Sequence, residues 1–548
     1  MRDEPNESHG SELPRCATDF IDEVTKNIRY RRKIREDVGA ELTAHFEDHL
    51  RECKGPQERE QMCRQLMGEF GDPKLLAVLC RRAKKRCRPL WCKVLVRSAQ
   101  SLSMLILYCV LCSLPLFVGK PTVRVDYAKW LSERWRPSQK GVENAKQYYD
   151  QAAKLYIQPP KALEARRTSP GWTIRDCNEA DFQSLADWLA QNEPAFDLLR
   201  KGAATAYYWP VYDVAEWNRY DAPFMWIEAN VVPLALASVS PYKPMAKGLA
   251  DRASYRARRG AVGEALDDCL TIRRFGLHLE GKGLSVEQLV GIAIEALGYG
   301  TLFEVLHGSQ VPADVLTRVQ SEMADAFDED RRVFDVDGAK VFWYDNIQRT
   351  FTDDGQGDGR ALRRGLPFAA GGLTDTLART LVFDYPSRRE AVVEVDAYFG
   401  QLQQLLCTWP GREELSLGGM EKLRASKMNW LLAASAPADE GLVHLVWRTK
   451  TYEVGAVTTV AILRYKAEKG TYPDRLDDLV QAGFLVSVPD DPFGRGPLTY
   501  NKAATGFTLY SWGQNRVDDD GRQGLGREGK RLIWADNGDA VFWPVSED

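Results

Sequence analysis

Carboxylates are concentrated in one short stretch near the C-terminus, FTLYSWGQNRVDDDGRQG, which covers Phe507–Gly524. Asp518 and Asp520 belong to three consecutive aspartates that precede a glycine, soon after a run of alternating apolar residues. Calcium accepts several carboxylate and carbonyl oxygens from a flexible loop, so this stretch could hold Ca²⁺. Aspartate and glycine are also typical of solvated turns. The stretch alone leaves both interpretations open.

Two histidines, His45 and His49, are four residues apart and would share one face of a helix. Histidines on one helix face can bind zinc together. The sequence HFEDH lacks the glutamate beside the first histidine that a zinc protease requires. We therefore expect both side chains to serve helix packing and capping.

A second acidic loop, FTDDGQGDGR, has oxygen-bearing residues at the spacing of a calcium-binding loop. The first, third, fifth and sixth positions of that motif are filled by Asp354, Gln356, Asp358 and Gly359. The twelfth position, which supplies a bidentate glutamate in the complete motif, is Gly365. The motif is therefore incomplete, and we expect a flexible acidic loop.

Aromatic side chains gather between Ala206 and Trp226, where Trp209, Trp217 and Trp226 could line a groove for a glycan or a peptide. The alternative is that these rings form part of a core. We find no nucleophile elbow, phosphate-binding loop, dinucleotide fingerprint or catalytic-cysteine signature. We assign no catalytic residue and favour a non-enzymatic role, although glycosidase chemistry by a carboxylate pair stays open.

A membrane anchor is predicted from Ser98–Gly119, which is 22 residues long and carries no charge. Such a length is enough to cross a hydrocarbon core of about 30 Å as a helix. Arg81–Arg97, directly before it, holds eight basic residues and no acid, which is the pattern of a cytoplasmic flank. We predict one transmembrane helix at 95–119, with the N-terminus in the cytoplasm, the C-terminus outside, and the lipid bilayer as a partner. A buried core helix is the alternative.

Composition agrees with this topology. The chain has 548 residues, of which 44% are hydrophobic and 27% charged, so a globular protein with several domains is expected. The net charge of -4 provides no basic field for nucleic acid, which we exclude as a partner. Of 11 cysteines only Cys177, Cys269 and Cys407 follow the anchor, as expected if that part lies outside the reducing cytoplasm.

Before the anchor, we expect a disordered stretch at 1–19 and a helical domain at 20–92. Apolar residues at helical spacing predict one amphipathic helix over Phe20–Leu50. A second helix ends at Gly71, and a third begins after it, because Asp72 suits an N-cap and Pro73 a first helical position.

The patterns IREDVGAELTAHFEDHL and LMGEFGDPKLLA resemble a small helical prefix domain that precedes the membrane segments of bacterial proteins, including permease-associated ones. The likeness rests on Glu41, Leu42, His45, Leu50, Phe70, Gly71, Asp72 and Pro73. It implies a position in the chain and no particular activity.

After the anchor, helical periodicity dominates an extracytoplasmic domain at 121–440. Leu249–Leu279 is similar to one tetratricopeptide-like hairpin, in which Ala253, Ala257 and Gly260 would let two helices approach. No second copy follows at a fixed period. We therefore expect an irregular helical bundle or a short solenoid.

The last region, 445–548, is predicted to contain a helix that ends at Gly470, followed by short strands. GFTLYSWG and DAVFWP are the clearest of these strands because they combine apolar alternation with aromatic residues. We expect an α+β domain with a small antiparallel sheet.

This region resembles the globular part of the major pseudopilin of type II secretion systems. The matching residues are Tyr465, Gly470, Tyr472, Pro473, Leu476, Leu479, Pro489, Asp491, Pro492, Phe493, Gly494, Tyr500, Tyr510, Ser511, Gly513 and Asp539. The resemblance implies calcium in the loop after the tyrosine-serine strand, with Asp518, Asp520 and Asp539 as ligands. Unlike the family, this chain has more than 300 residues between anchor and domain, so we do not expect a pilus subunit.

The complete architecture is multidomain and mainly α, and it resembles uncharacterised membrane proteins of planctomycete-type bacteria. We expect a single-pass protein of the inner membrane that acts as an interaction or scaffold module of the cell envelope, with protein partners there and a link to secretion. The alternative is an extracytoplasmic glycan-binding protein or hydrolase that uses the aromatic patch.

Overall fold

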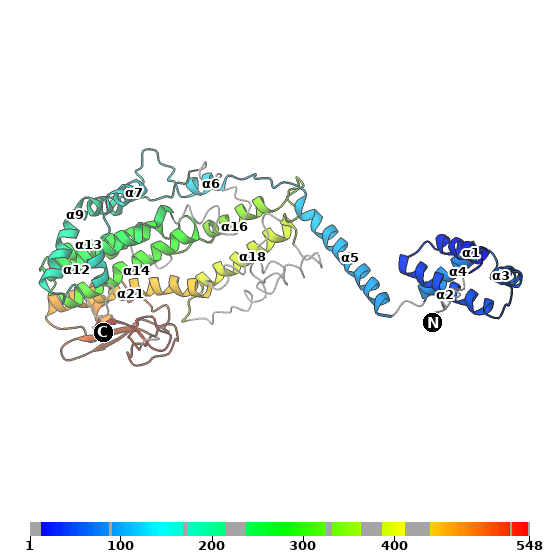
Figure 1. The fold of residues 1–548 in the computed structure, drawn as a ribbon. Helices are drawn as coiled ribbons and strands as arrows, with labels where there is room; N and C mark the ends of the chain where they lie inside the picture. The colour runs from blue at the N-terminus through cyan, green and yellow to red at the C-terminus, as the bar shows by residue number, and fades with distance from the viewer. Residues whose placement is uncertain are drawn as a thin grey trace. The chain divides into compact units, whose positions relative to one another are not determined.

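A computed structural model gives the fold of the chain, which is mainly helical with one small three-stranded antiparallel sheet (Figure 1). The structure describes residues 13–86, 90–167, 173–213, 237–324, 331–362, 386–411, 439–526 and 529–545. The chain divides into two compact units, Met1–Val110 and Leu111–Asp548.

The first unit is a small helical domain with a core of its own. Its helices are α1 (Arg15–Asn27), α2 (Arg32–Leu50), α3 (Pro56–Phe70), α4 (Pro73–Arg86) and the first part of α5 (Leu90–Phe117). The core cluster lies within α1–α4 and the turns between them, and includes Phe20, Val24 and Phe46. The predicted stop at Gly71 is confirmed: Gly71 has a φ of 72°, and the Lys74 N–H donates to Asp72 Oδ1 at 2.9 Å.

The single helix predicted over Phe20–Leu50 is wrong, because the chain breaks between α1 and α2. After Ile28, the positions that would continue the apolar stripe of one long helix are filled by Arg31, Arg32 and Arg35. The two helices instead fold back on each other, so that both apolar faces reach one core.

The packing role expected for the two histidines is confirmed. The rings of His45 and His49 stack with centroids 4.3 Å apart, and His45 also packs edge-on against Phe70 at 5.2 Å. His49 Nδ1 lies 2.9 Å from the His45 carbonyl oxygen.

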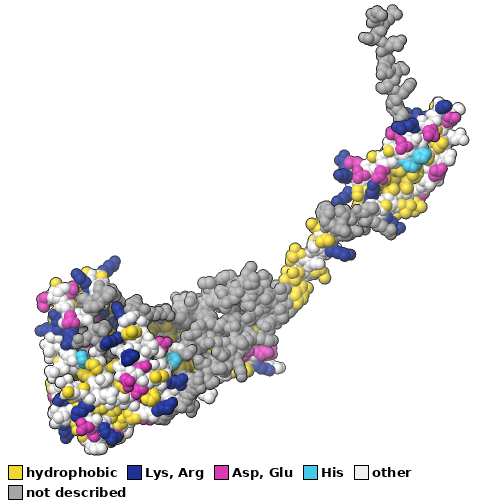
Figure 2. All heavy atoms as spheres, turned by 90° about the horizontal axis from the view of Figure 1, so that it is seen from below, with side chains coloured by type: hydrophobic (Ala, Val, Ile, Leu, Met, Phe, Trp, Pro, Cys, Tyr) yellow, Lys and Arg dark blue, Asp and Glu magenta, His cyan; other side chains and the backbone are white. Residues whose placement is uncertain are grey.

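Two helices among the described residues are long and apolar enough to cross a membrane. One is Val94–Leu111 within α5, none of which is buried, and Figure 2 shows its surface as largely hydrophobic. The other is α14 (Ser285–Gly308), which is mostly buried and serves as a core helix of the second unit.

The second unit consists of many helices around α14 and ends in the sheet. Its other helices among the described residues are α6 (Tyr127–Arg134), α7 (Ala145–Leu155), α8 (Lys161–Arg167), α9 (Glu179–Ala204), α12 (Tyr242–Arg258), α13 (Val262–Leu279), α15 (Ala313–Ala324), α16 (Val336–Thr350), α18 (Arg388–Cys407), α21 (Asp439–Lys469) and α22 (Asp477–Gln481). The strands are β1 (Thr499–Lys502), β2 (Phe507–Ser511) and β3 (Ala540–Trp543), in the order β1-β2-β3.

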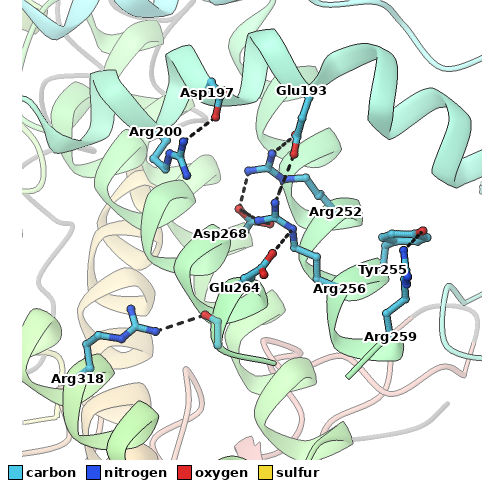
Figure 3. A network of polar contacts seen from close by, with 11 residues as sticks. Glu193, Asp197, Arg200, Arg252, Tyr255, Arg256, Arg259, Glu264, Asp268 and Arg318 are labelled. Carbon is cyan, nitrogen blue, oxygen red and sulfur yellow. Dashed lines mark hydrogen bonds and ion pairs between the residues drawn. The ribbon is translucent and has the colours of Figure 1, made fainter. Parts of the chain in front are cut away.

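The helical hairpin expected at Leu249–Leu279 is confirmed as α12 and α13. Ion pairs join it to α9, as Figure 3 shows. Arg252 Nη2 donates to Asp268 Oδ1 at 2.7 Å, and Arg256 Nη1 lies 3.0 Å from Asp268 Oδ2. Both arginines also pair with Glu193 of α9. The directional hydrogen bonds of these charged groups thus fix the position of the hairpin against α9 more specifically than apolar packing alone would.

The predicted strands at GFTLYSWG and DAVFWP are confirmed as β2 and β3, which pair antiparallel. The predicted helix before them is the second half of α21, and it ends where Gly470 adopts a φ of 81°. The sheet packs on this half of α21, and one core cluster contains residues of α13, α14 and α15 together with the sheet. The regions predicted at 121–440 and 445–548 therefore share a core.

The closest helix packing is between α13 and α14, which lie side by side in Figure 1. A Cβ added at Gly276 would lie 2.6 Å from the Glu295 nitrogen, and one at Gly298 would lie 2.9 Å from the Arg273 nitrogen. Both approaches are to backbone atoms, which cannot move aside as a flexible side chain can. Glycine is therefore required at these positions for the two backbones to touch.

Gly298→Ala should lower the free energy of unfolding by about 1–3 kcal/mol, because the methyl group has no room against α13. Gly300→Ala, two residues further along the same helix, meets no atom within 4 Å and should be neutral or stabilising. Urea unfolding of the full chain in detergent, followed by tryptophan fluorescence, would measure both variants. All tryptophans except Trp91 follow residue 111, so the signal reports the second unit. Equal stability of the two variants would contradict the close approach.

Candidate functional site

Of the three tryptophans of the aromatic patch, only Trp209 lies within the residues that the structure describes. Trp209 is half-buried, and its backbone is held by Asn144, whose Nδ2 donates to the Trp209 carbonyl at 2.9 Å. Trp217 and Trp226 lie outside the described residues. A groove lined by the three tryptophans therefore stays a prediction.

The carboxylates proposed as calcium ligands organise the loop between β2 and β3. Asp539 is fully buried, and its Oδ2 accepts from the backbone N–H groups of Asp519 at 3.1 Å and Gly521 at 2.8 Å. Asp518 is exposed, and its Oδ1 accepts from the Tyr510 hydroxyl at 3.0 Å and the Asp520 N–H at 3.1 Å. Within the described ranges, no group of three or more His, Cys, Asp or Glu side chains is arranged to hold a metal.

One feature of this loop is still compatible with a cation. Asp539 Oδ1 is buried and has no hydrogen-bond partner among the described residues. Burial raises the pKa of Asp539 to about 6, and the nearby Asp519 and Asp518 add to the rise, while the two backbone donors oppose it. A calcium ion at Asp539, Asp518 and Asp520 stays a prediction. The unpartnered Oδ1 of Asp539 favours it, whereas the lack of a group of three or more suitable side chains among the described residues does not.

The second acidic loop uses its carboxylates in the same way. Asp354 Oδ1 accepts from the N–H groups of Gln356 at 2.7 Å and Asp358 at 3.0 Å. Asp353 accepts from Arg388 Nη1 at 2.6 Å. These carboxylates close turns and pair with a cation of the chain.

A network of buried charges joins α13, α14 and α21, and we call it the buried ion network. Its members are Arg273, Glu280, Glu295, Tyr299, Arg331 and Glu453. Arg273 Nη2 donates to Glu453 Oε1 at 2.6 Å, and Arg331 Nη1 donates to Glu295 Oε1 at 2.9 Å. Tyr299 links the two pairs, since it accepts from Arg273 Nε at 2.8 Å and donates to Glu295 at 3.1 Å.

The buried ion network contains three carboxyl groups but only two guanidinium groups. Burial, together with the neighbouring carboxylate of Glu295, raises the pKa of Glu280 far above its ordinary range. Burial also opposes ionisation of Glu295, but the charge of Arg331 and its hydrogen bonds to Glu295 outweigh it and lower the pKa of Glu295. Both carboxyl oxygens of Glu280 are buried without a hydrogen-bond partner among the described residues, which also disfavours its ionised form.

A second polar group lies between α7, α9, α12, α13 and the start of α14, and we call it the tyrosine–carboxylate cluster. It consists of Lys146, Tyr149, Asp150, Tyr208, Tyr212, Tyr242, His278, Lys282 and Glu287. No sequence motif marks these residues, because they come from five separate segments of the chain. Sequence reasoning missed the cluster except for the aromatic run that contains Tyr208 and Tyr212.

Glu287 is the most deeply placed acid of the cluster. Its Oε2 accepts from the Leu284 N–H at 2.8 Å and from the Tyr212 hydroxyl, whereas its Oε1 is buried without a partner among the described residues. Burial raises the pKa of Glu287 to about 7, although the bonds from Tyr212 and Leu284 oppose the rise. Gly283, with a φ of 77°, leaves room for the Tyr212 hydroxyl to approach Glu287, because a Cβ at position 283 would lie 3.0 Å from that hydroxyl.

His278 supports the cluster as a neutral ring. Burial and the nearby Lys282 lower its pKa to about 3. Its Nδ1 lies 2.7 Å from the Tyr149 hydroxyl, so the neutral ring accepts that proton. The Tyr208 ring stacks on His278 with centroids 6.1 Å apart, and the Tyr208 hydroxyl has no partner among the described residues.

The cluster reaches solvent through Asp150, whose side chain is 42% exposed. Lys146 Nζ donates to Asp150 Oδ1 at 2.9 Å and to Ser238 Oγ at 3.1 Å, and the Tyr242 hydroxyl donates to Asp150 at 2.9 Å. The charge of Lys146 acts on Glu287 and that of Asp150 acts on Tyr208, so the two orphaned oxygens lie near the groups that reach the surface. Such an arrangement can hold water or a small polar ligand and can take up or release a proton near neutral pH.

No family model, no curated protein and no solved structure matches the chain. The arrangement of these side chains is therefore the only guide to their function.

Arg331→Met should lower the free energy of unfolding by about 3–5 kcal/mol, because it leaves buried carboxylates without their cation. Arg332→Met is the matched control: that side chain is 63% exposed and pairs with Asp335 at 3.5 Å, so the loss should be under about 1 kcal/mol. Urea unfolding at neutral pH would compare the two. Similar losses for both variants would contradict the role of the buried ion network.

Glu287→Gln should raise the free energy of unfolding relative to wild type by an amount that increases with pH. The acid has an ordinary pKa of 4.5 when unfolded and about 7 when folded, so burying it as an anion costs the native state about 3 kcal/mol above neutral pH and nothing below about 4.5. The variant removes this cost while its amide oxygen can still accept from Leu284 and Tyr212. Urea unfolding at about pH 5 and pH 8 would measure the change, with the exposed Glu133→Gln as control. A difference between variant and wild type that does not change with pH would refute the assignment.

Proposed function

We propose that the protein is a single-pass protein of the inner membrane of bacteria that acts as an interaction or scaffold module of the cell envelope. In this proposal α5 is the anchor, the first unit lies in the cytoplasm and the second unit lies outside. The exposed apolar surface of α5 and the basic residues before it support the anchor. The pseudopilin resemblance supports a link to secretion.

The continuous helix α21 is the observation that carries the scaffold role. It has 31 residues and so extends about 46 Å. Its first half packs with α18, and its Leu442, Val446 and Trp447 share one core cluster with residues of α16 and α18. Its second half lies under the sheet and packs with α14 and α15 through Val457 and Val460. One rigid element therefore fixes the C-terminal sheet to the helical domain and presents it in a constant orientation.

The same packing argues against assembly of many copies through α21, because most of its apolar side chains are covered within the chain, with Leu445 37% exposed. Partners would instead contact the outer loops of the C-terminal region. Val486, Val517 and Leu532 are exposed there, with Val486 99% exposed. Exposed apolar side chains on loops suit contact with another protein.

Site-specific photocrosslinking in native membranes tests this role. A crosslinking residue at Val486 or Leu532 should give the same protein adduct, whereas one at Leu155 on α7, which is also exposed, should not. A topology reporter at the C-terminus should be active only outside the cytoplasm. No adduct at either loop position, or a reporter active in the cytoplasm, would reject the proposal.

A second candidate function is binding or hydrolysis of an extracytoplasmic glycan. The orphaned Glu287 Oε1 and Tyr208 hydroxyl favour it, because both lie beside the chain segment that begins the aromatic patch. A thermal-shift and turnover screen against cell-wall polysaccharides would test it on wild type and Glu287→Gln. A shift that the variant loses would support a ligand at the cluster, and no shift and no turnover would exclude it.

A further inference from the structure

The outward face of α4 in the first unit is apolar. Ala77 faces the core and is buried, with Leu76 and Cys80 packed beside it. On the other side of the helix, Leu75 is 60% exposed, Val78 37% and Leu79 53%. Their spacing of three and four residues places the three side chains on one face. Within residues 13–86 they are the three large hydrophobic side chains that are exposed, so exposed apolar area is concentrated at this face.

The same helix carries only positive charge. The sequence of α4, PKLLAVLCRRAKKR, contains six basic residues and no acid. Arg81 and Arg82 are exposed one turn after the apolar face, and Lys74 is exposed beside Leu75. Lys84 lies on the opposite side, where it pairs with Glu41 of α2. Within residues 13–86 the acids lie on α1–α3 and in the turns between the helices, so the cations of α4 border its apolar face without acids on the same helix.

We propose that this face of α4 docks the first unit on a membrane surface that contains anionic lipids. Leu75, Val78 and Leu79 would enter the headgroup region, and Lys74, Arg81 and Arg82 would contact lipid phosphates. A helix with an apolar face bordered by Lys and Arg is the pattern of an interfacial helix, and its affinity depends on both features.

A membrane fits this face better than a protein partner because of its place in the chain. Only three residues separate Arg86, the last residue of α4, from Leu90, the first of α5, so the two ends lie within about 15 Å. If α5 spans the bilayer, as the proposed function states, α4 is tethered at the interface. The anionic inner leaflet then complements a helix that has no negative charge.

Binding of the isolated unit to vesicles tests the proposal. Residues 13–86 contain the complete core cluster of α1–α4, and the fragment lacks α5, so the result does not depend on whether α5 spans a membrane. The fragment should sediment with vesicles of phosphatidylcholine and phosphatidylglycerol, and not with phosphatidylcholine alone. High salt should release it.

Two variants separate the contributions of charge and apolar contact. Each basic residue near an anionic surface raises the partition coefficient of a protein onto the membrane about fivefold. Arg81→Gln with Arg82→Gln should therefore weaken binding of the fragment to the vesicles about 30-fold. Arg29→Gln with Arg35→Gln removes the same charge from exposed positions near the α1–α2 turn and should weaken binding far less. Leu75→Ser with Leu79→Ser should abolish sedimentation while circular dichroism stays unchanged, because both side chains are exposed.

Three results would overturn the proposal. The first is that the fragment fails to bind anionic vesicles. The second is that the two double arginine variants weaken binding equally. The third is that the fragment forms a dimer in sedimentation velocity and that Leu75→Ser with Leu79→Ser dissociates this dimer. The last result would assign the face to a second copy of the chain. Loss of vesicle binding with a correctly oriented C-terminal reporter would leave the proposed function intact and reject only the docking of α4.

Discussion

The backbone contact between α13 and α14 is the constraint on which the rest of the second unit depends. Gly276 and Gly298 bring the two helices so close that side chains on either side of the contact must interdigitate. Arg273 therefore lies against Tyr299, and Glu280 against Glu295, far from water. α14 contains three acids and no lysine or arginine among its 24 residues, which explains how a core helix can be apolar enough to cross a membrane.

Charge balance then connects distant parts of the chain. Two arginines, Arg273 and Arg331, face three buried carboxyl groups, and the pKa of Glu280 is raised by burial and by the charge of Glu295. Glu453 brings α21 into the same network, and α21 carries the sheet. A buried ion pair adds little net stability compared with apolar packing, but breaking it is costly, so such groups favour one arrangement over others. The orientation of the sheet on the helical domain is fixed by this specificity together with the shared core.

Much of the fold follows from sequence patterns alone. The stop at Gly71, the hairpin of α12 and α13, the end of α21 at Gly470 and the two clearest strands were all predicted from local signals, since caps, glycine conformations and alternation act within a few residues. The break between α1 and α2 was missed, although arginines at the positions of the apolar stripe were a usable signal. The tyrosine–carboxylate cluster was also missed, because its members are scattered over more than 100 residues.

The sequence by itself determined the helical class, the small antiparallel sheet, the uncharged stretch of α5 and its basic flank, because each depends on residues that are neighbours in the chain. Only the tertiary structure decided which carboxyl groups are buried, which of them have raised pKa values, and that α21 belongs to both the helical domain and the sheet. Those properties depend on distances and dielectric surroundings created by packing. A glutamate in the sequence has the same ordinary pKa wherever it occurs, and only folding makes Glu287 different from an exposed acid such as Glu133.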